Sequence, residues 1–314
     1  MLNLSTSEIN NPALNTLAME LFGGIEAGGT KFVCALGSRS GEILAESTFA
    51  TEAPNETMRA VVAFFRDRAR TQPLTAIGIG AFGPIDLNLR SEHYGCITST
   101  PKAAWRYFDI VGAVRQALGV PIGFDTDVNA TALGEWHWGA ARELDTFLYV
   151  TVGTGVGGGA MVNGRLLHGM LHPEMGHIRI PHNRSLDPYT GCCPYHGDCL
   201  EGLVCGPALE SRWGQPAVSL PHDHPAWALE THYLGLAVAN WVCCFAPQRI
   251  IIGGGIMRRR ELLPQIRAHA RALLNDYIQT PQLRDGLDDY LVAPMLGSRA
   301  GVLGAIALAI QTTT

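Results

Sequence analysis

The sequence predicts an α/β protein of two lobes that face each other across a cleft. Predicted strands alternate with amphipathic helices along most of the 314 residues, which is typical of sheets covered by helices. Each half also opens in the same order, with a strand, a glycine-rich loop and a second strand, at 21–36 and again at 146–162. Two lobes built on one pattern would leave a cleft where they meet.

The composition excludes several classes of protein. A hydrophobic content of 47% and a charged content of 16% are those of a folded chain rather than a disordered one. A net charge of −5 gives no basic surface, so we expect no nucleic-acid partner. The apolar stretch at 300–310 is too short to span a bilayer, so we expect no membrane partner. Eight cysteines without a secretory signal favour a cytoplasmic chain with reduced thiols.

The lobes can be assigned to ranges of the sequence. Residues 1–20 are polar and Asn-rich, without clear periodicity, and are predicted to form a flexible leader. The N-terminal lobe is predicted at 21–127, completed by the last helix at 298–312. The C-terminal lobe is predicted at 128–297 and includes a Cys- and His-rich loop at 172–206.

The individual elements follow from periodicity and turn residues. Short apolar or alternating runs between glycine-rich turns predict strands, and Met58, Val61 and Phe65 share one face of a predicted helix. In the first half these patterns give strands at 21–25, 31–36, 41–49, 75–80 and 121–124, and helices at 57–70, 108–118 and 130–140. In the second half they give strands at 146–152, 160–162, 249–252 and 290–293, and helices at 226–245, 261–274 and 298–310.

The loop at 172–206 carries ligands that suit a structural zinc ion. Cys193, His196 and Cys199 form a C-x2-H-x2-C run. Thiolate and imidazole are preferred zinc ligands, and two-residue spacing allows one turn to present them to a single ion. One buried Cys or His more often fills space, but two Cys and one His at this spacing favour zinc. Three residues compete for the fourth position: His177, His182 and Cys192.

Two glycine runs resemble nucleotide-binding motifs without their structural context. Residues 24–31 nearly match a P-loop, but Thr30 and Lys31 stand in reversed order and a strand rather than a helix follows. Residues 153–158 satisfy G-x-G-x-x-G, but they lead into a hairpin strand instead of opening a helix. We interpret both runs as tight hairpins whose bare N–H groups bind phosphate oxygens. A third run, Gly253–Gly255, follows another buried strand and favours nucleotide binding further.

Asp127 lies between the predicted strand at 121–124 and the helix that follows. An aspartate there can cap the helix, a role that Asp125 and Asn129 could share. It can also act as a general base at a strand end, taking a proton from a hydroxyl during phosphoryl transfer. The residues alone favour neither interpretation.

A series of short motifs extends from about Gly23 to the last helix: GGIEAGGTKF, GAFGPID, TPKAAWRYF, DTDVNATALGE, TVGTGVGGG, HPEMGHI, CPYHGDCLEG and GGGIM. Their content and order resemble the ROK family of sugar kinases (repressor, open reading frame, kinase), and within it the bacterial fructokinases. The resemblance implies a two-lobed actin-like ATPase fold of the ribonuclease H-like kind. It implies ATP-dependent phosphorylation of a hexose, D-fructose to fructose 6-phosphate in the first place, by a homodimer with Mg2+ and structural Zn2+.

The resemblance also assigns roles to individual residues. Asp127 matches the general base, and Gly83 and Pro84 match a loop that lines the sugar pocket. The phosphate loops and the adenosine loop are matched in turn by Gly28, Gly29, Thr30 and Lys31, by Gly153, Thr154 and Gly155, and by Gly253, Gly254 and Gly255. Side chains that hydrogen-bond the sugar are matched by Glu174, His177 and Glu201. The zinc ligands are matched by His177, Cys193, His196 and Cys199, so the resemblance selects His177 for the fourth position.

Two positions depart from the family's pattern. Glu26 stands where many members carry Asp, so a longer carboxylate would approach Mg2+ or its waters. Thr126 stands where glucose-specific relatives usually carry Asn, which disfavours glucose. The alternatives are a hexokinase for mannose or glucose and, in a different class, a non-catalytic sugar-sensing regulator. A regulator of this family needs an N-terminal DNA-binding domain, which the short polar leader is not expected to supply.

Overall fold

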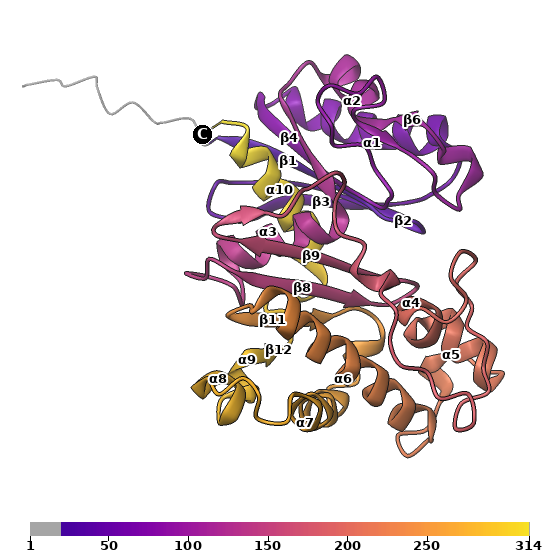
Figure 1. Ribbon diagram of the computed structural model, residues 1–314. Helices are drawn as coiled ribbons and strands as arrows, with labels where there is room; N and C mark the ends of the chain where they lie inside the picture. The colour runs from indigo at the N-terminus through magenta and orange to yellow at the C-terminus, as the bar shows by residue number, and fades with distance from the viewer. Residues whose placement is uncertain (1–19, 314) are drawn as a thin grey trace, which may run out of the picture.

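The computed structural model describes residues 20–313, so the predicted leader lies outside the described residues except for its last position. Two five-stranded sheets form the framework, one in each half of the chain. Two helices lie between the sheets, α3 (Asp127–Trp138) and α10 (Ala300–Gln311) (Figure 1). Among the described helices, none is both long enough and apolar enough to cross a membrane.

The first sheet contains β1 (Leu21–Ala27), β2 (Lys31–Gly37), β3 (Ile43–Ala50), β4 (Leu74–Ala81) and β7 (Ile122–Thr126). Its order is β3-β2-β1-β4-β7, with the first three strands antiparallel and β4 and β7 parallel to β1. The helices α1 (Pro54–Ala69) and α2 (Ile110–Leu118) pack on one face, where Phe65 joins the core. The last helix, α10, packs on the other face and brings Ile306 against Phe22 and its neighbours.

The second sheet contains β8 (Phe147–Val152), β9 (Val156–Val162), β10 (Arg165–Leu166), β11 (Arg249–Gly253) and β12 (Leu291–Val292). Its order is β10-β9-β8-β11-β12, with the same strand directions as the first sheet, so the predicted duplication is confirmed. One face is covered by α6 (Ala226–Phe245) and α7 (Leu262–Leu274). The other face is covered by α3.

The two central helices approach each other closely enough to exclude side chains from their crossing. A Cβ atom on Gly304 of α10 would lie 1.9 Å from the carbonyl oxygen of Ala130 in α3. A Cβ atom on Gly134 would lie 2.9 Å from the backbone nitrogen of Gly304. The glycines therefore allow backbone-to-backbone packing, and this contact joins the two sheets.

Some predicted boundaries were wrong for identifiable reasons. The second glycine hairpin is shorter than predicted, because β9 begins at Val156 and Gly157–Gly159 belong to the strand. These glycines lie under the start of α3, where a Cβ atom on Gly159 would be 2.7 Å from the carbonyl oxygen of Val128. Helix α3 also starts earlier than predicted, and its N-cap is Thr126, whose hydroxyl accepts from Asn129 N at 3.1 Å.

The remaining elements are short and mostly belong to connections. Their helices are α4 (Leu200–Val204), α5 (Gly206–Trp213), α8 (Pro281–Arg284) and α9 (Leu287–Tyr290). Their strands are β5 (Cys96–Ile97) and β6 (Phe108–Asp109). Single 3-10 turns occur at η1 (Ala103–Trp105), η2 (Met175–His177), η3 (Ala217–Ser219), η4 (Ile256–Arg258) and η5 (Gly297–Arg299).

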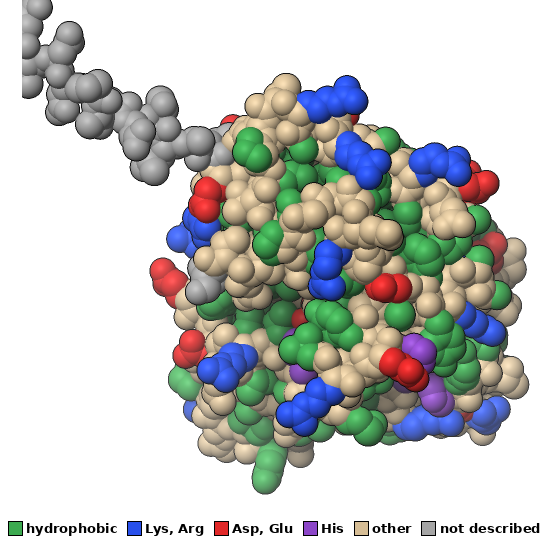
Figure 2. All heavy atoms as spheres, turned by 90° about the horizontal axis from the view of Figure 1, so that it is seen from above, with side chains coloured by type: hydrophobic (Ala, Val, Ile, Leu, Met, Phe, Trp, Pro, Cys, Tyr) green, Lys and Arg blue, Asp and Glu red, His purple; other side chains and the backbone are tan. Residues whose placement is uncertain are grey.

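The predicted lobe boundary between residues 127 and 128 stays a prediction, and it falls in the first turn of α3. On the face drawn in Figure 2, Lys and Arg side chains are scattered among acidic and apolar ones and do not gather into one patch.

Candidate active site and metal centre

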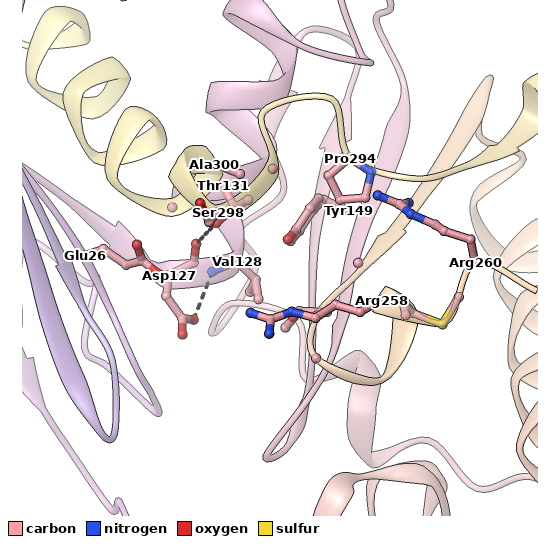
Figure 3. Close-up of a pocket in the computed structure, with 17 residues that line it drawn as sticks. Glu26, Asp127, Val128, Thr131, Tyr149, Arg258, Arg260, Pro294, Ser298 and Ala300 are labelled. Atoms are coloured by element: carbon pink, nitrogen blue, oxygen red, sulfur yellow. Dashed lines mark hydrogen bonds between the residues drawn. The ribbon is translucent and has the colours of Figure 1, made fainter. Parts of the chain in front are cut away.

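A cavity of about 340 Å³ lies where the first turns of α3 and α10 meet both sheets. Glu26 reaches it from β1, Asp127 from α3 and Tyr149 from β8. Figure 3 shows the two carboxylates on one side of the cavity and Arg258 across from them. The predicted adenosine loop, Gly253–Gly255, forms part of the wall, whereas the two predicted phosphate hairpins are not among the residues that line it.

Asp127 has the electrostatic character of a base that works near neutral pH. Its Oδ1 accepts a hydrogen bond from Val128 N at 2.9 Å. The pKa of Asp127 is raised to about 6, mainly by burial and in smaller part by the nearby Glu174 carboxylate, against the lowering effect of the Val128 amide. A carboxylate of this kind is ionised at pH 7 and still a better proton acceptor than an exposed aspartate.

Glu26 makes the same cavity suited to a divalent cation. Burial raises its pKa to about 7, and the charge of Asp127 adds to that rise, while Lys31 opposes it. A Cβ atom on Gly301 would lie 2.3 Å from the Glu26 carboxyl carbon, so the carboxylate rests against the first turn of α10. Two desolvated carboxylates that repel each other are hard to ionise together. Mg2+ bound by them, directly or through water, would relieve that repulsion.

The predicted sugar-binding carboxylates also lie together. The pKa of Glu174 is raised to about 7, mainly by burial and in smaller part by the charge of Glu201. Oε2 of Glu201 accepts from Val156 N at 2.9 Å, and Oε1 lies 4.0 Å from Nε2 of His177. The structure therefore brings Asp127, Glu174, His177 and Glu201 into one electrostatically coupled group at the lobe junction.

The second glycine hairpin is joined to this group. Gly153 N donates to Gly155 O at 2.8 Å, and Gly206 N donates to Gly153 O at 2.7 Å. A Cβ atom on Gly155 would lie 2.7 Å from Oε2 of Glu201, so a larger residue there would displace that carboxylate. A Cβ atom on Gly153 would lie 3.7 Å from Gly255 N, which places the hairpin beside the wall of the cavity.

The first glycine hairpin is held by its own sheet. Gly28 N donates to Lys31 O at 3.0 Å, and Thr51 N donates to Thr30 O at 3.0 Å. The Thr51 hydroxyl donates to Gly28 O at 2.7 Å. Thr30 and Lys31 are exposed at the tip, and a Cβ atom on Gly29 would meet only Cε of Lys102, at 3.4 Å.

The loop at 83–85 is predicted to line the sugar pocket. Gly83 and Pro84 are joined by a cis peptide bond. Pro84 O accepts from both the backbone nitrogen of Thr98, at 2.7 Å, and its hydroxyl, at 3.0 Å. A Cβ atom on Gly83 would lie 3.5 Å from Cε1 of His172, so this N-terminal loop faces the C-terminal half of the chain.

Four side chains from the loop at 172–206 form a group that fits zinc. The ligand atoms of His177, Cys193, His196 and Cys199 lie within 4.8 Å of one another. Sγ of Cys193 is 3.7 Å from Nδ1 of His177 and 3.6 Å from Nδ1 of His196, and Sγ of Cys199 is 3.5 Å from Nδ1 of His177. Zn–S and Zn–N bonds in a tetrahedron put sulfur and nitrogen about 3.5 Å apart, so the group has the size of a zinc site.

The two competing ligands have other partners. His182 contacts Asp198 through Nδ1 at 3.1 Å and the carbonyl oxygen of Asp187 through Nε2 at 2.9 Å. Sγ of Cys192 lies 3.5 Å from Sγ of Cys205, outside the group. His177 supplies the fourth ligand atom, and its second nitrogen faces Glu201.

Comparisons with known proteins agree with this arrangement. The family model described as "ROK family" matches residues 22–312. The chain belongs to the ROK family. It is 43% identical to a protein of Pediococcus pentosaceus named "Fructokinase", over 92% of this chain and 97% of that protein. It is 44% identical to a "Fructokinase" of Lactococcus lactis, over 83% of this chain and 87% of that one.

A solved ROK structure shows the same fold. The glucokinase of Streptomyces griseus, in complex with glucose and AMPPNP, is 25% identical and superposes with a TM-score of 0.71. The match covers 93% of this chain and 99% of that one. The duplicated sheets joined by α3 and α10 are thus the two-lobed actin-like ATPase fold of ROK proteins, as predicted.

Several residues at the ROK site were not singled out in the sequence. Glu135, at the end of α3, accepts from Met295 N at 3.2 Å and from Leu296 N at 3.0 Å, which holds the loop before α10 against the cavity. Tyr149 and Arg258 line the cavity (Figure 3). The Arg-Arg-Arg run that follows GGGIM could have predicted basic residues beside the adenosine loop. No pattern in the sequence around Glu135 indicates its contact with the loop before α10.

Proposed function

We propose that this chain is an ATP-dependent fructokinase that converts D-fructose to fructose 6-phosphate. The observation that carries the proposal is the single group formed by Asp127, Glu174, His177 and Glu201 at the junction of two lobes. A hydroxylated substrate that binds there lies within reach of one base of raised pKa. The named fructokinases at 43% and 44% identity favour fructose over other hexoses.

The nucleotide would occupy the cavity, with its adenosine beside Gly253–Gly255 and its phosphates toward the hairpins at 28–31 and 153–155. Thr30, Lys31 and Thr154 would supply side-chain contacts to the phosphates in addition to backbone N–H groups. Lobe closure would exclude water from the transferring phosphoryl group.

Asp127 would accept the proton of the attacking hydroxyl as the phosphoryl group moves in line to that oxygen. Glu174, His177 and Glu201 would hydrogen-bond the other hydroxyls and so orient the sugar. Gly83 and Pro84 would line the opposite side of the sugar pocket.

The two metal ions would have different tasks. Mg2+ bound near Glu26 would neutralise phosphate charge, with Glu26 and Asp127 as the carboxylates close to it. Zn2+ would be held by His177, Cys193, His196 and Cys199, which leaves no open position for a substrate. Its ligand loop would keep His177 oriented, with Nδ1 bound and Nε2 facing the sugar side.

The direct test is a coupled ADP-release assay on fructose, glucose, mannose and N-acetylmannosamine, with and without Mg2+. We expect the highest kcat/KM for fructose and dependence on Mg2+. The position of the new phosphate, read by 31P NMR, should be the 6-hydroxyl. A higher kcat/KM for glucose or mannose would make that hexose the assigned substrate. If none of the four sugars stimulates ADP release, the kinase activity is rejected.

Two further properties belong to the proposal. The chain would act as a homodimer in the cytoplasm, by analogy with its family, and would have no nucleic-acid partner, consistent with its net charge of −5. Light scattering after gel filtration tests the dimer, and a gel-shift assay on duplex DNA tests the regulator, which would bind DNA and turn over no ATP.

A further inference from the structure

His172 connects the two lobes at the proposed sugar site. It lies in the C-terminal half, after β10, yet its ring packs against the N-terminal loop at 83–85. The residue is only 6% exposed. Its Nε2 lies 3.2 Å from Ile85 N, and its Nδ1 lies 3.4 Å from Oε1 of Glu174. One imidazole thus stands between two parts of the site that come from different lobes.

The hydrogen bond to Ile85 fixes which nitrogen of His172 carries the proton. A backbone N–H can only donate, so Nε2 must be the unprotonated, accepting nitrogen. Burial lowers the pKa of His172, which favours the neutral ring. The neutral ring with Nε2 bare carries its proton on Nδ1, and that N–H is the one beside Glu174.

The two partners of His172 differ in how firmly they are held. The loop at 83–85 is tied to the N-terminal lobe, because Pro84 O accepts two hydrogen bonds from Thr98 and Ile85 pairs with Ile97. The side chain of Glu174 is 41% exposed and has no hydrogen bond from another described side chain, apart from the His172 contact. His172 therefore links a partly exposed carboxylate to a loop that is held in the opposite lobe.

We propose that His172 is a positioning residue for the sugar, which accepts from Ile85 N and donates from Nδ1 to Glu174. Through it, the Gly83–Pro84 loop and the Glu174 carboxylate meet the sugar as one unit. The 3.4 Å contact between Nδ1 and Oε1 of Glu174 is an ion-pair distance without hydrogen-bond alignment, and the backbone of Pro173 is a second partner of the ring. The donation to Glu174 would align when a sugar orders that carboxylate, since catalytic contacts commonly tighten in the complex. This inference rests on the proposed function, because it assigns Glu174 to the sugar.

Two conservative substitutions separate the two hydrogen bonds. In His172→Gln the amide reaches the place of Nε2, so the contact to Ile85 is kept and the donor to Glu174 is lost. In His172→Asn the amide reaches the place of Nδ1, so the donor to Glu174 is kept and Ile85 N loses its partner. The half-buried His137, whose Nε2 is buried without a hydrogen bond, offers a matched control as His137→Gln.

The variants are compared by steady-state kinetics with fructose and ATP varied separately, and by calorimetric titration of fructose without ATP. We expect His172→Gln to raise the fructose KM and Kd by about tenfold or more, the usual effect of losing a hydrogen bond to a charged group. Its ATP KM should stay within about threefold of wild type and its Tm should be unchanged. His172→Asn should lower Tm and affect the fructose KM less, and His137→Gln should change neither KM.

A purely structural histidine would give a different pattern. In that case His172→Gln would bind fructose as wild type does, or would raise both KM values equally, and either result would overturn the inference. In a Glu174→Gln background, His172→Gln should have little further effect on the fructose Kd, and an undiminished effect would also overturn it. Wild-type protein that binds fructose but does not phosphorylate it would reject the proposed function alone, whereas no binding of fructose, glucose or mannose would reject both.

Discussion

The two glycine hairpins occupy the same place in two sheets of the same order, but they are supported in opposite ways. The hairpin at 28–31 is closed by bonds to its own strand and to Thr51 at the end of the neighbouring one. The hairpin at 153–155 is supported from outside its sheet, by Gly206 and by Glu201 of the short helix that follows the metal ligands. The first hairpin is therefore local in its stability, and the second depends on the zinc loop.

This difference links the proposed metal site to one of the two proposed phosphate loops. Cys199 is a ligand in the metal group and also precedes α4, whose first turn carries Glu201. The loop that carries the proposed metal ligands thus orients Glu201, which contacts both His177 and the end of the second hairpin. We infer that metal binding acts on one hairpin and leaves the other unaffected, and the following predictions test that asymmetry.

The largest effect is expected where the two lobes meet. Asp127→Asn removes the proposed base and should lower kcat by about 100-fold or more in the sugar-kinase assay. The same change should stabilise the fold at pH 8, because the pKa of Asp127, raised to about 6 in the folded chain, makes its ionised form costly there. Because the pKa of Asp127 is higher in the folded chain than in the unfolded one, the stability gained by Asp127→Asn should shrink as the pH falls from 6 toward 4. Denaturant titrations at several pH values measure this gain as a free energy of unfolding. Near-normal turnover would remove Asp127 from the role.

Cys193→Ser should loosen the second hairpin and leave the first unchanged, because only the second depends on the metal-binding loop. We expect loss of the bound zinc, a fall in Tm on the order of 10 °C, and faster amide exchange at 153–156 than in wild type, with exchange at 28–33 unchanged. The exposed Cys243 provides the control as Cys243→Ser, which should keep metal, Tm and activity. If metal analysis of Cys193→Ser still finds one tightly bound zinc, the ligand set is wrong, and equal loosening of both hairpins would refute the asymmetry.

A matched pair of alanine substitutions compares the hairpins directly. Gly155→Ala places a Cβ atom 2.7 Å from the Glu201 carboxylate, whereas Gly29→Ala meets only the end of the Lys102 side chain at 3.4 Å. We expect Gly155→Ala to lower kcat/KM about tenfold, because the overpacked carboxylate must move. Gly155→Ala should also speed amide exchange at 153–156, whereas Gly29→Ala should leave Tm and amide exchange in its own hairpin unchanged. Equal increases in exchange in the two hairpins would show that they are supported alike.

The smallest effect is a pH dependence. With the pKa of Asp127 raised to about 6, the ionised base is lost as the pH falls through that value. The kcat/KM of the wild type should therefore be level near pH 8 and fall about tenfold per unit below pH 6. A profile that stays level down to pH 5 would mean that no group of raised pKa limits the reaction.

Local patterns predicted the long elements well. The helix at 226–245 was predicted with the bounds that the structure has, because a mainly apolar segment begins at Ala226 and ends before Pro247. The boundaries failed where tertiary contacts decide them. Gly157–Gly159 look like a loop in the sequence, yet they pair with β8 as a strand. The start of α3 packs on Gly157 and Gly159, and Met175 packs on Gly158, too closely for a Cβ atom. The cap of α3 was missed because Thr126 competes with two acidic neighbours that cap equally well.

The sequence by itself determined the duplicated strand–loop–strand pattern, the spacing of Cys193, His196 and Cys199, and the family to which the chain belongs. These are local or motif-level properties, which depend on side-chain periodicity and on the ligands that a single turn can present. The family resemblance selected His177 as the fourth member of the metal group, and the structure places it there. Only the tertiary structure showed that His172 spans the lobes. Such contacts join residues far apart in the chain, and their geometry follows only from how the two sheets pack across α3 and α10.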